Sequence, residues 1–253
     1  MERRPIIQVK GLAARYGEET ILEHVTFDVY EGEIFVILGG SGSGKSTLLK
    51  HMVGLIPPYS GRIVVDGDDI NGADTETFHR ILKKIGILYQ GGALFGSMTL
   101  AQNIALPIEE HTGLGPEAVS VLVRMKLGLV HLDGYEDHLP SELSGGMKRR
   151  AGLARAMALN PKILFFDEPS AGLDPVTSAG IDHLILHINR TLGTTMVIVT
   201  HELQSIFSVA RRVIMLDKEK KGILAEGDPK HLRDHSPISE VRRFFNRQAE
   251  DGP

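Results

Sequence analysis

A glycine-rich run near residue 40 has the residue types and spacing needed to bind phosphate groups. It reads Gly39-Gly40-Ser41-Gly42-Ser43-Gly44-Lys45-Ser46-Thr47 and fits the pattern G-x-x-x-x-G-K-[ST]. Glycines reach backbone angles closed to other residues, so successive N–H groups can point at one anion. Lys45 can reach the β- and γ-phosphate oxygens, and the Ser46 hydroxyl can ligate Mg²⁺. The run therefore predicts binding of a nucleoside triphosphate with Mg²⁺.

Two adjacent carboxylates end an apolar segment later in the chain. Asp167 and Glu168 follow Ile163–Phe166. In a protein with a phosphate-binding loop, a strand of this kind places its last acid near the metal, so we expect Asp167 to contact Mg²⁺. Glu168 can polarise a water for attack on the γ-phosphate, which is the role of a general base. Alone, the pair is equally compatible with solvated acids at a strand end; the glycine-rich run favours hydrolysis.

A second run suited to anions begins at Leu143. Ser144 is a good N-cap for the basic helix that follows, and Gly145 and Gly146 leave backbone N–H groups accessible. Met147 comes next. One chain thus carries two phosphate sites that cannot both serve the same nucleotide, which predicts that two copies share their nucleotides.

These groups must be positioned by strands and helices that the apolar patterns predict. Strand-sized apolar runs occur at 34–38, 63–65, 85–89, 163–166, 195–199 and 213–216. Helical patterns follow at 45–54 and 176–192 and dominate about 91–160. Alternating strands and helices predict an α/β domain with a wound, mainly parallel sheet, an antiparallel N-terminal β part and an inserted helical subdomain. We expect this domain to span 1–227, with a helical tail at 228–253.

The composition excludes several classes of function. The chain has 253 residues, a net charge of -4 and no cysteine. The charge balance does not indicate a nucleic-acid partner, and thiolate chemistry is absent. No apolar run approaches the about 18 residues needed to cross a bilayer. Any service to a membrane is therefore expected to pass through a partner.

Taken together, these segments resemble the ABC ATPase family over about residues 6–227. That family carries Leu-Ser-Gly-Gly-Gln about twenty residues before the acidic strand, as Leu143 stands before Ile163 here. The resemblance implies a P-loop NTPase of the ABC ATPase type that hydrolyses ATP as a homodimer, with each ATP between the P-loop of one copy and Ser144-Gly145-Gly146 of the other. Met147 departs from the family Gln, so one polar contact is lost or replaced by water.

The resemblance implies four further roles. Tyr16 would stack on adenine, and Asp174 would cross the dimer interface. Gln90 would contact Mg²⁺ and water and link the site to a membrane partner. His201 would touch the γ-phosphate. The implied catalytic set is Lys45, Gln90, Glu168 and His201, and the implied Mg²⁺ ligands are Ser46, Gln90 and Asp167.

Some segments are similar to a narrower group, the Mla/Mce-type lipid-transport ATPases. They are Gly91–Phe95, Ala105–Thr112, Pro140–Glu142 and Gly146–Arg150. This similarity implies a phospholipid cargo moved between inner and outer membranes, a MlaE-like permease, a small regulatory subunit and a location on the cytoplasmic face of the bacterial inner membrane. Leu94 and Phe95 would help to receive the permease; the alternative is that they pack in the core.

Other interpretations remain open from the sequence alone. The chemistry is the same in an ATPase of another solute ABC transporter and in a soluble iron–sulfur assembly ABC ATPase. The apolar residues Ile238, Val241, Phe244 and Phe245 could clasp a second subunit or pack on their own domain. His183 and His187 have a spacing that can bind metal, but without a third ligand a solvated helix face is favoured.

Overall fold

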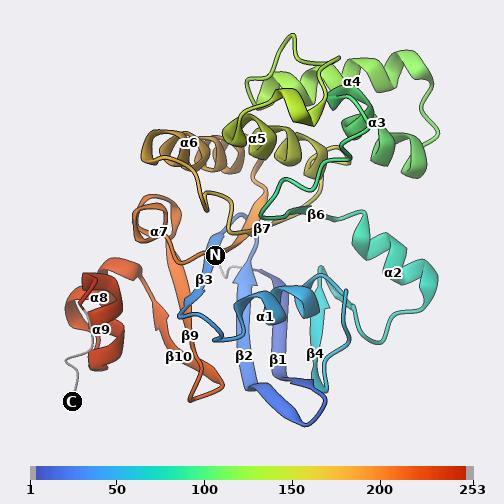
Figure 1. Ribbon diagram of the computed structural model, residues 1–253. Helices are drawn as coiled ribbons and strands as arrows, with labels where there is room; N and C mark the ends of the chain where they lie inside the picture. The colour runs from blue at the N-terminus through green and yellow to red at the C-terminus, as the bar shows by residue number, and fades with distance from the viewer. Residues whose placement is uncertain (1–3, 249–253) are drawn as a thin grey trace. The chain divides into compact units, whose positions relative to one another are not determined.

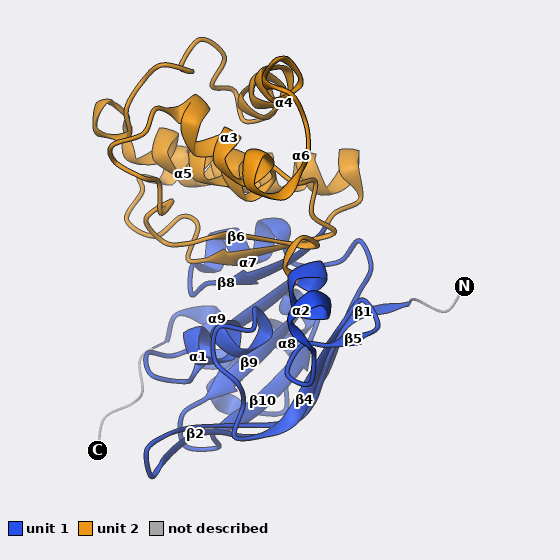
Figure 2. Ribbon diagram, turned by 90° about the vertical axis from the view of Figure 1, so that its right-hand side faces the viewer, with its two compact units in different colours: residues 1–81, 195–253 blue, residues 82–194 orange. Residues whose placement is uncertain are grey.

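The structure, a computed structural model, describes residues 4–248, so the end of the predicted tail at 249–253 lies outside the described residues. The chain divides into two compact units (Figure 2). The first unit comprises the chain up to residue 81 and from residue 195 onward. The second unit comprises residues 82–194.

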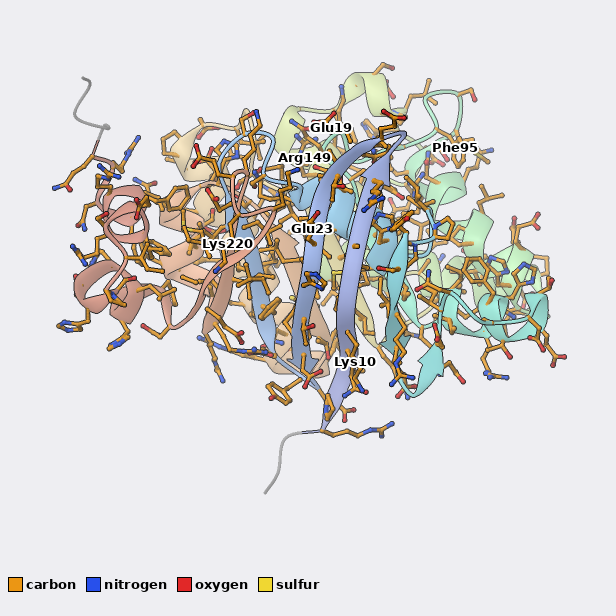
Figure 3. All side chains as sticks on the ribbon, turned by 90° about the horizontal axis from the view of Figure 1, so that it is seen from below. Lys10, Glu19, Glu23, Phe95, Arg149 and Lys220 are labelled. Atoms are coloured by element: carbon orange, nitrogen blue, oxygen red, sulfur yellow. The ribbon has the colours of Figure 1, made fainter. Side chains whose placement is uncertain are left out.

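The first unit contains an antiparallel sheet built from the N-terminal part of the chain. Its order is β2-β1-β4-β5, with bounds β1 Pro5–Tyr16, β2 Glu19–Tyr30, β4 Ser60–Val65 and β5 Asp68–Asp69. The long strands β1 and β2 run side by side, with Lys10 on one and Glu19 and Glu23 on the other (Figure 3). Buried and exposed residues alternate along β2 at Val25, Phe27 and Val29. The antiparallel N-terminal β part is confirmed.

The first unit also contains parallel strands that position the phosphate-binding run. β3 (Ile34–Gly39) pairs in parallel with β8 (Thr195–Val199) and with β9 (Arg212–Asp217), and β10 (Gly222–Gly227) pairs antiparallel with β9. Every residue of β3 and β8 is buried, which explains their continuous apolar sequences.

The described part of the first unit also contains five helices: α1 Lys45–Met52, α2 Thr75–Leu82, which ends at the unit boundary, α7 Leu203–Val209, α8 Pro229–His235 and α9 Ser239–Asn246. α1 is two residues shorter than its pattern predicts. It ends at Met52 because Val53 caps it and Gly54 takes a φ of +74°, which only glycine adopts readily.

The C-terminal helices pack on their own unit (Figure 1). Val241 and Phe245 of α9 are buried, and the Phe245 ring lies 5.8 Å from the Phe207 ring of α7. The described part of the tail therefore packs on its own unit through these two residues, whereas Ile238 and Phe244 are half-buried, and contact with a second subunit stays a prediction.

The second unit combines two parallel strands with helices. β6 (Ile85–Leu88) pairs in parallel with β7 (Ile163–Asp167). Its helices are α3 Leu100–His111, α4 Pro116–Leu129, a short 3₁₀ helix at Pro140–Glu142, α5 Gly145–Ala156 and α6 Pro175–Leu192. The helical character predicted for 91–160 is observed between 100 and 156, although the domain boundaries themselves stay a prediction. Among residues 4–248 we find no helix with both the length and the apolar character needed to cross a bilayer.

Candidate functional site

The glycine-rich run has the local structure that phosphate binding requires. β3 ends at Gly39, and α1 begins at Lys45 after a loop in which Gly42 and Gly44 take φ values of +76° and +94°. A Cβ on Gly39 would lie 2.3 Å from the carbonyl oxygen of Leu216 in β9, so only glycine fits there. The loop therefore has the strand-before, helix-after context that the sequence predicted.

The loop also presents groups suited to a triphosphate. The Lys45 ammonium donates to the carbonyl oxygens of Gly39 and Gly40, each at 2.8 Å, and so lies across the loop. The Ser43 hydroxyl is buried and has no hydrogen-bond partner among residues 4–248. The first turn of α1 contains no acid, so its positive end is not neutralised locally. These features fit a bound polyphosphate.

His201 lies just after the carboxyl end of β8, and the glycine-rich run begins at the carboxyl end of the neighbouring parallel strand β3. Ile37 of β3 pairs with Val199 of β8, and the Thr200 N–H donates to the Ile37 carbonyl at 3.2 Å. Because parallel strands point the same way, His201 and the P-loop lie at the same end of the β3–β8 pair. Tyr16, at the end of β1, is 47% exposed, as a residue that stacks on a ligand must be.

In the second unit, Gln90 and the acid pair lie at the carboxyl ends of neighbouring strands. Leu88, the last residue of β6, pairs in parallel with Phe166 of β7; Gln90 follows β6, and Asp167 is the last residue of β7. Burial raises the pKa of the Tyr89 hydroxyl, and the charge of Asp167 adds to this effect. Glu168, directly after β7, has a φ of +49°, a left-handed value that is uncommon for a non-glycine residue.

The predicted Mg²⁺ ligands Ser46, Gln90 and Asp167 offer hydroxyl, amide and carboxylate oxygens, the donors that Mg²⁺ prefers. Ser46 belongs to the first unit, whereas Gln90 and Asp167 belong to the second. The Mg²⁺ site therefore stays a prediction. Within the part of the chain that the structure describes, no three His, Cys, Asp or Glu side chains cluster so as to hold a metal ion.

The predicted second anion site lies at the N-terminus of α5. The Ser144 hydroxyl accepts from the Met147 N–H at 3.3 Å, so its predicted N-cap role is observed. Asp174 caps α6 in the same way, and its hydrogen bonds to Thr177 lower the pKa of its carboxyl. Gly146 packs directly against α6. A Cβ at this position would lie 2.4 Å from the Thr177 methyl carbon, which is too close for any side chain.

Sequence reasoning missed several residues that hold these segments together. The Arg149 guanidinium donates to the carbonyl oxygens of Pro169 and Ala171, at 3.2 and 3.1 Å, and so ties α5 to the segment before Asp174. Gly92 and Gly152 let the segment after Gln90 approach α5, since a Cβ on either would lie 2.7 Å from a backbone oxygen. The only sequence signal of the Arg149 contact was the run of basic residues that follows Met147.

The packing of Gly146 gives a sharp prediction. We expect Gly146→Ala to lower ATP hydrolysis at least about tenfold, because the added methyl group displaces the start of α5 from Thr177. Nucleotide binding to the P-loop should be unchanged. Adding Thr177→Ser removes the clashing methyl but keeps the hydroxyl, so the double variant should regain activity. The matched control is Gly113→Ala, where a Cβ meets nothing within 4 Å. Equal turnover of Gly146→Ala and wild type would contradict the close packing.

The segment after Gln90 carries an exposed aromatic side chain. Phe95 is 50% exposed, with the Arg155 guanidinium 5.4 Å from its ring centre, and Leu94 is half-buried. Core packing, one of the two alternatives for this pair, is therefore not observed for Phe95 (Figure 3). Buried Asn103 of α3 holds the segment by hydrogen bonds. Its amide nitrogen donates to the carbonyls of Phe95, Met98 and Thr99, and its amide oxygen accepts from the Phe95 N–H.

Removing this amide should loosen the segment. We expect Asn103→Ala to lower the free energy of unfolding by about 1–3 kcal/mol, since it strands buried backbone groups, and to speed hydrogen exchange at the Phe95 N–H. Glu109→Ala, an exposed change on the same helix, should stay within about 0.5 kcal/mol. Unchanged exchange at Phe95 in Asn103→Ala would show that the amide does not order the segment.

The sequence of this chain is similar to those of known ATP-binding proteins, in agreement with its glycine-rich loop. A family model described as ABC transporter matches residues 22–171. MlaF, the intermembrane phospholipid transport system ATP-binding protein, is 38% identical over 98% of this chain in Haemophilus influenzae and in Escherichia coli, covering 92% and 91% of those proteins. The probable ribonucleotide transport ATP-binding protein mkl of Mycobacterium leprae is 42% identical over 95% of this chain and 68% of its own length.

Solved structures show the same fold. A dimeric ATP-binding cassette in a post-hydrolysis state, bound to ADP and Pi, superposes with a TM-score of 0.79 at 30% identity, covering 88% of this chain and 98% of that one. The cbiO1 protein of Clostridium perfringens, part of an ABC transporter complex, gives a TM-score of 0.83 at 28% identity, covering 96% of both chains. These matches confirm the predicted fold class, and the chain belongs to the ABC transporter family, as the ATP-binding and ATP-hydrolysing subunit of a transporter.

Proposed function

We propose that this chain energises the movement of phospholipid between two membranes through a separate permease. The observation that carries the proposal is the match to MlaF, which extends over 98% of this chain and at least 91% of each relative. The segments Gly91–Phe95 and Gly146–Arg150, which suggested lipid transport in the sequence, lie against each other through Gly92 and α5. A ribonucleotide cargo is the alternative that the mycobacterial relative's name suggests; that relative is 42% identical, and the chain spans 68% of its length, against at least 91% of each MlaF protein.

Hydrolysis would follow from the side chains at the two strand edges. Lys45 and the glycine-loop N–H groups would hold the β- and γ-phosphates. Glu168 would accept a proton from the attacking water while the water oxygen forms a bond to the γ-phosphorus. The bond between the γ-phosphorus and the oxygen that leaves with ADP would break. Gln90 and His201 would orient that water. ADP and phosphate are the products.

A magnesium ion would be held by Ser46, Gln90 and Asp167, which together supply three oxygen donors. When bound, it would neutralise part of the charge that develops on the transferring phosphoryl group. Tyr16 would add stacking on the base.

The working unit would be a homodimer with ATP shared between copies. Ser144, Gly145 and Gly146 of one copy would donate to the γ-phosphate held by the P-loop of the other, and Asp174 would lie near the interface. Support comes from the N-terminus of α5, where Ser144 is the N-cap and Ser144 and Gly145 are exposed, and from the dimeric state of the solved relative. The exposed Phe95 is a candidate contact for the permease, which we expect to resemble MlaE, and a small regulatory subunit is a further expected partner. The chain would then sit peripherally on the cytoplasmic face of the inner membrane.

The proposal is tested by purifying the tagged protein from its native membranes in mild detergent and identifying the copurifying proteins and lipids. We expect an integral-membrane permease, a lipid-binding partner and phospholipid, all reduced in a Phe95→Ser variant. Glu110→Ser, an exposed change on α3, is the matched control. A soluble scaffold protein without a permease would point instead to an assembly ATPase, and a permease that binds a water-soluble solute would exclude the lipid cargo.

A further inference from the structure

A pocket of about 300 Å³ in the second unit is lined by residues other than those of the predicted ATP and Mg²⁺ sites. It is lined by His131, Arg150, Gly180, His183, Leu184 and His187. Arg150 comes from α5, His131 follows the end of α4, and the rest come from consecutive turns of α6. The pocket therefore joins segments that are well separated in the sequence, and it gathers the two histidines whose spacing stood out there.

The polar side chains lining the pocket are Arg150 and the exposed His131, His183 and His187, and no carboxylate of residues 4–248 lines it. Arg150 is half-buried, and across residues 4–248 its side chain has neither an ion pair nor a hydrogen bond. Asp182, the acid next to His183, is buried and is not part of the lining. A guanidinium offers five N–H donors in a fixed fork and an imidazole offers one or two, so the pocket presents donors that no group within residues 4–248 accepts from.

The shape of the pocket suits a small ligand. Buried Leu184 contributes an apolar part of the wall. Gly180 has no side chain, and the space where a Cβ would stand is open. His131 takes a left-handed φ of +58° directly after α4, which turns the chain at this point. The volume exceeds that of a single phosphate and is at the lower end of the range for small-molecule sites.

These observations distinguish between two classes of ligand. A metal cation would meet the charge of Arg150, and the three histidines are not placed to ligate one. An oxyanion would be attracted by the guanidinium, which matches phosphate oxygens in a bidentate manner. The surrounding imidazoles would donate to its other oxygens.

We propose that this pocket binds a phosphate-type oxyanion, at a site separate from the P-loop. Arg150 supplies the principal charge-assisted contact, and His131, His183 and His187 supply the surrounding donors. A bound anion links α5, the helix capped by Ser144, to α6, the helix capped by Asp174. The inference does not depend on the identity of the transported cargo.

The test is a titration followed by NMR of the histidine rings, with Mg-ADP at saturating concentration so that the P-loop is filled. The signals are assigned by single His→Asn variants. Inorganic phosphate is the first probe and AMP the second. We expect the rings of His131, His183 and His187 to shift in a saturable way, while His201 serves as an internal reference for the P-loop edge. Tighter binding of AMP than of phosphate would assign a nucleotide-borne phosphate, and the reverse order would assign free phosphate.

Matched variants make the result decisive. Arg150→Gln should weaken binding at least about tenfold, because the charge-assisted contact is lost, and His187→Asn should weaken it less. Arg124→Gln, a change to an exposed arginine on α4 whose guanidinium donates to the Ser120 hydroxyl, should bind like wild type. Absence of saturable shifts with both probes, or equal affinity in wild type and Arg150→Gln, would overturn the proposal.

Discussion

Glu168→Gln is expected to slow ATP hydrolysis by about 10²–10⁴-fold while ATP binding is retained. Glutamine keeps the size of the side chain but cannot accept a proton from the attacking water. Glu168 directly follows β7 and is held at a left-handed φ of +49°, which fixes its position relative to Asp167. The P-loop residues lie in the other unit, so the phosphate contacts should survive.

The measurement is steady-state phosphate release, together with ATP affinity determined by equilibrium binding. Glu142→Gln is unsuitable as a control because its carboxylate accepts from the Leu139 N–H. Glu110→Gln, on an exposed face of α3, is the matched change and should hydrolyse ATP at the wild-type rate. Normal turnover in Glu168→Gln would remove this residue from the role of general base.

Arg212→Met is expected to lower the free energy of unfolding by about 3–5 kcal/mol, because it leaves the buried Glu33 carboxylate unpaired. The guanidinium donates to both oxygens of Glu33, at 2.9 and 2.8 Å, and to the Asp28 carbonyl. It also pairs with Glu226 and lies 4.7 Å from the Phe35 ring centre. Burial disfavours the charged guanidinium, but the hydrogen bonds and charge of Glu33 outweigh this and raise the pKa of Arg212.

The loss is measured by denaturant unfolding of the isolated chain. Arg62→Met, on an exposed position of β4, should change stability by less than about 0.5 kcal/mol. Combining Arg212→Met with Glu33→Gln should cost less than the sum of the single changes, since neither partner is then left charged and alone. Strict additivity would show that the two side chains do not interact.

The sequence was most informative where function demands a particular local structure. The strand, glycine loop and helix around Gly39–Lys45 could be predicted because those backbone angles and donors are local. The N-cap at Ser144 and the apolar strands were predictable for the same reason. Element ends were less so: α1 ends at Met52 because of the left-handed glycine that follows, whereas its apolar pattern continues to residue 54.

What the sequence could not supply are contacts between distant residues. Gly92 meets the backbone of Lys148, and Arg149 reaches Pro169 and Ala171, yet no spacing pattern predicts these partners. The basic pocket illustrates the same point. His183 and His187 alone favoured a solvated helix face; only the fold adds Arg150 and His131 to them.

The central claim is that ATP lies between two copies of the chain, and its most direct test uses Glu168→Gln with Mg-ATP. Light scattering coupled to size exclusion gives the molar mass, and the bound nucleotide is counted after denaturation. We expect a monomer without nucleotide and, with Mg-ATP, a dimer that retains two ATP molecules. A chain that stays monomeric with one ATP bound would contradict the shared site.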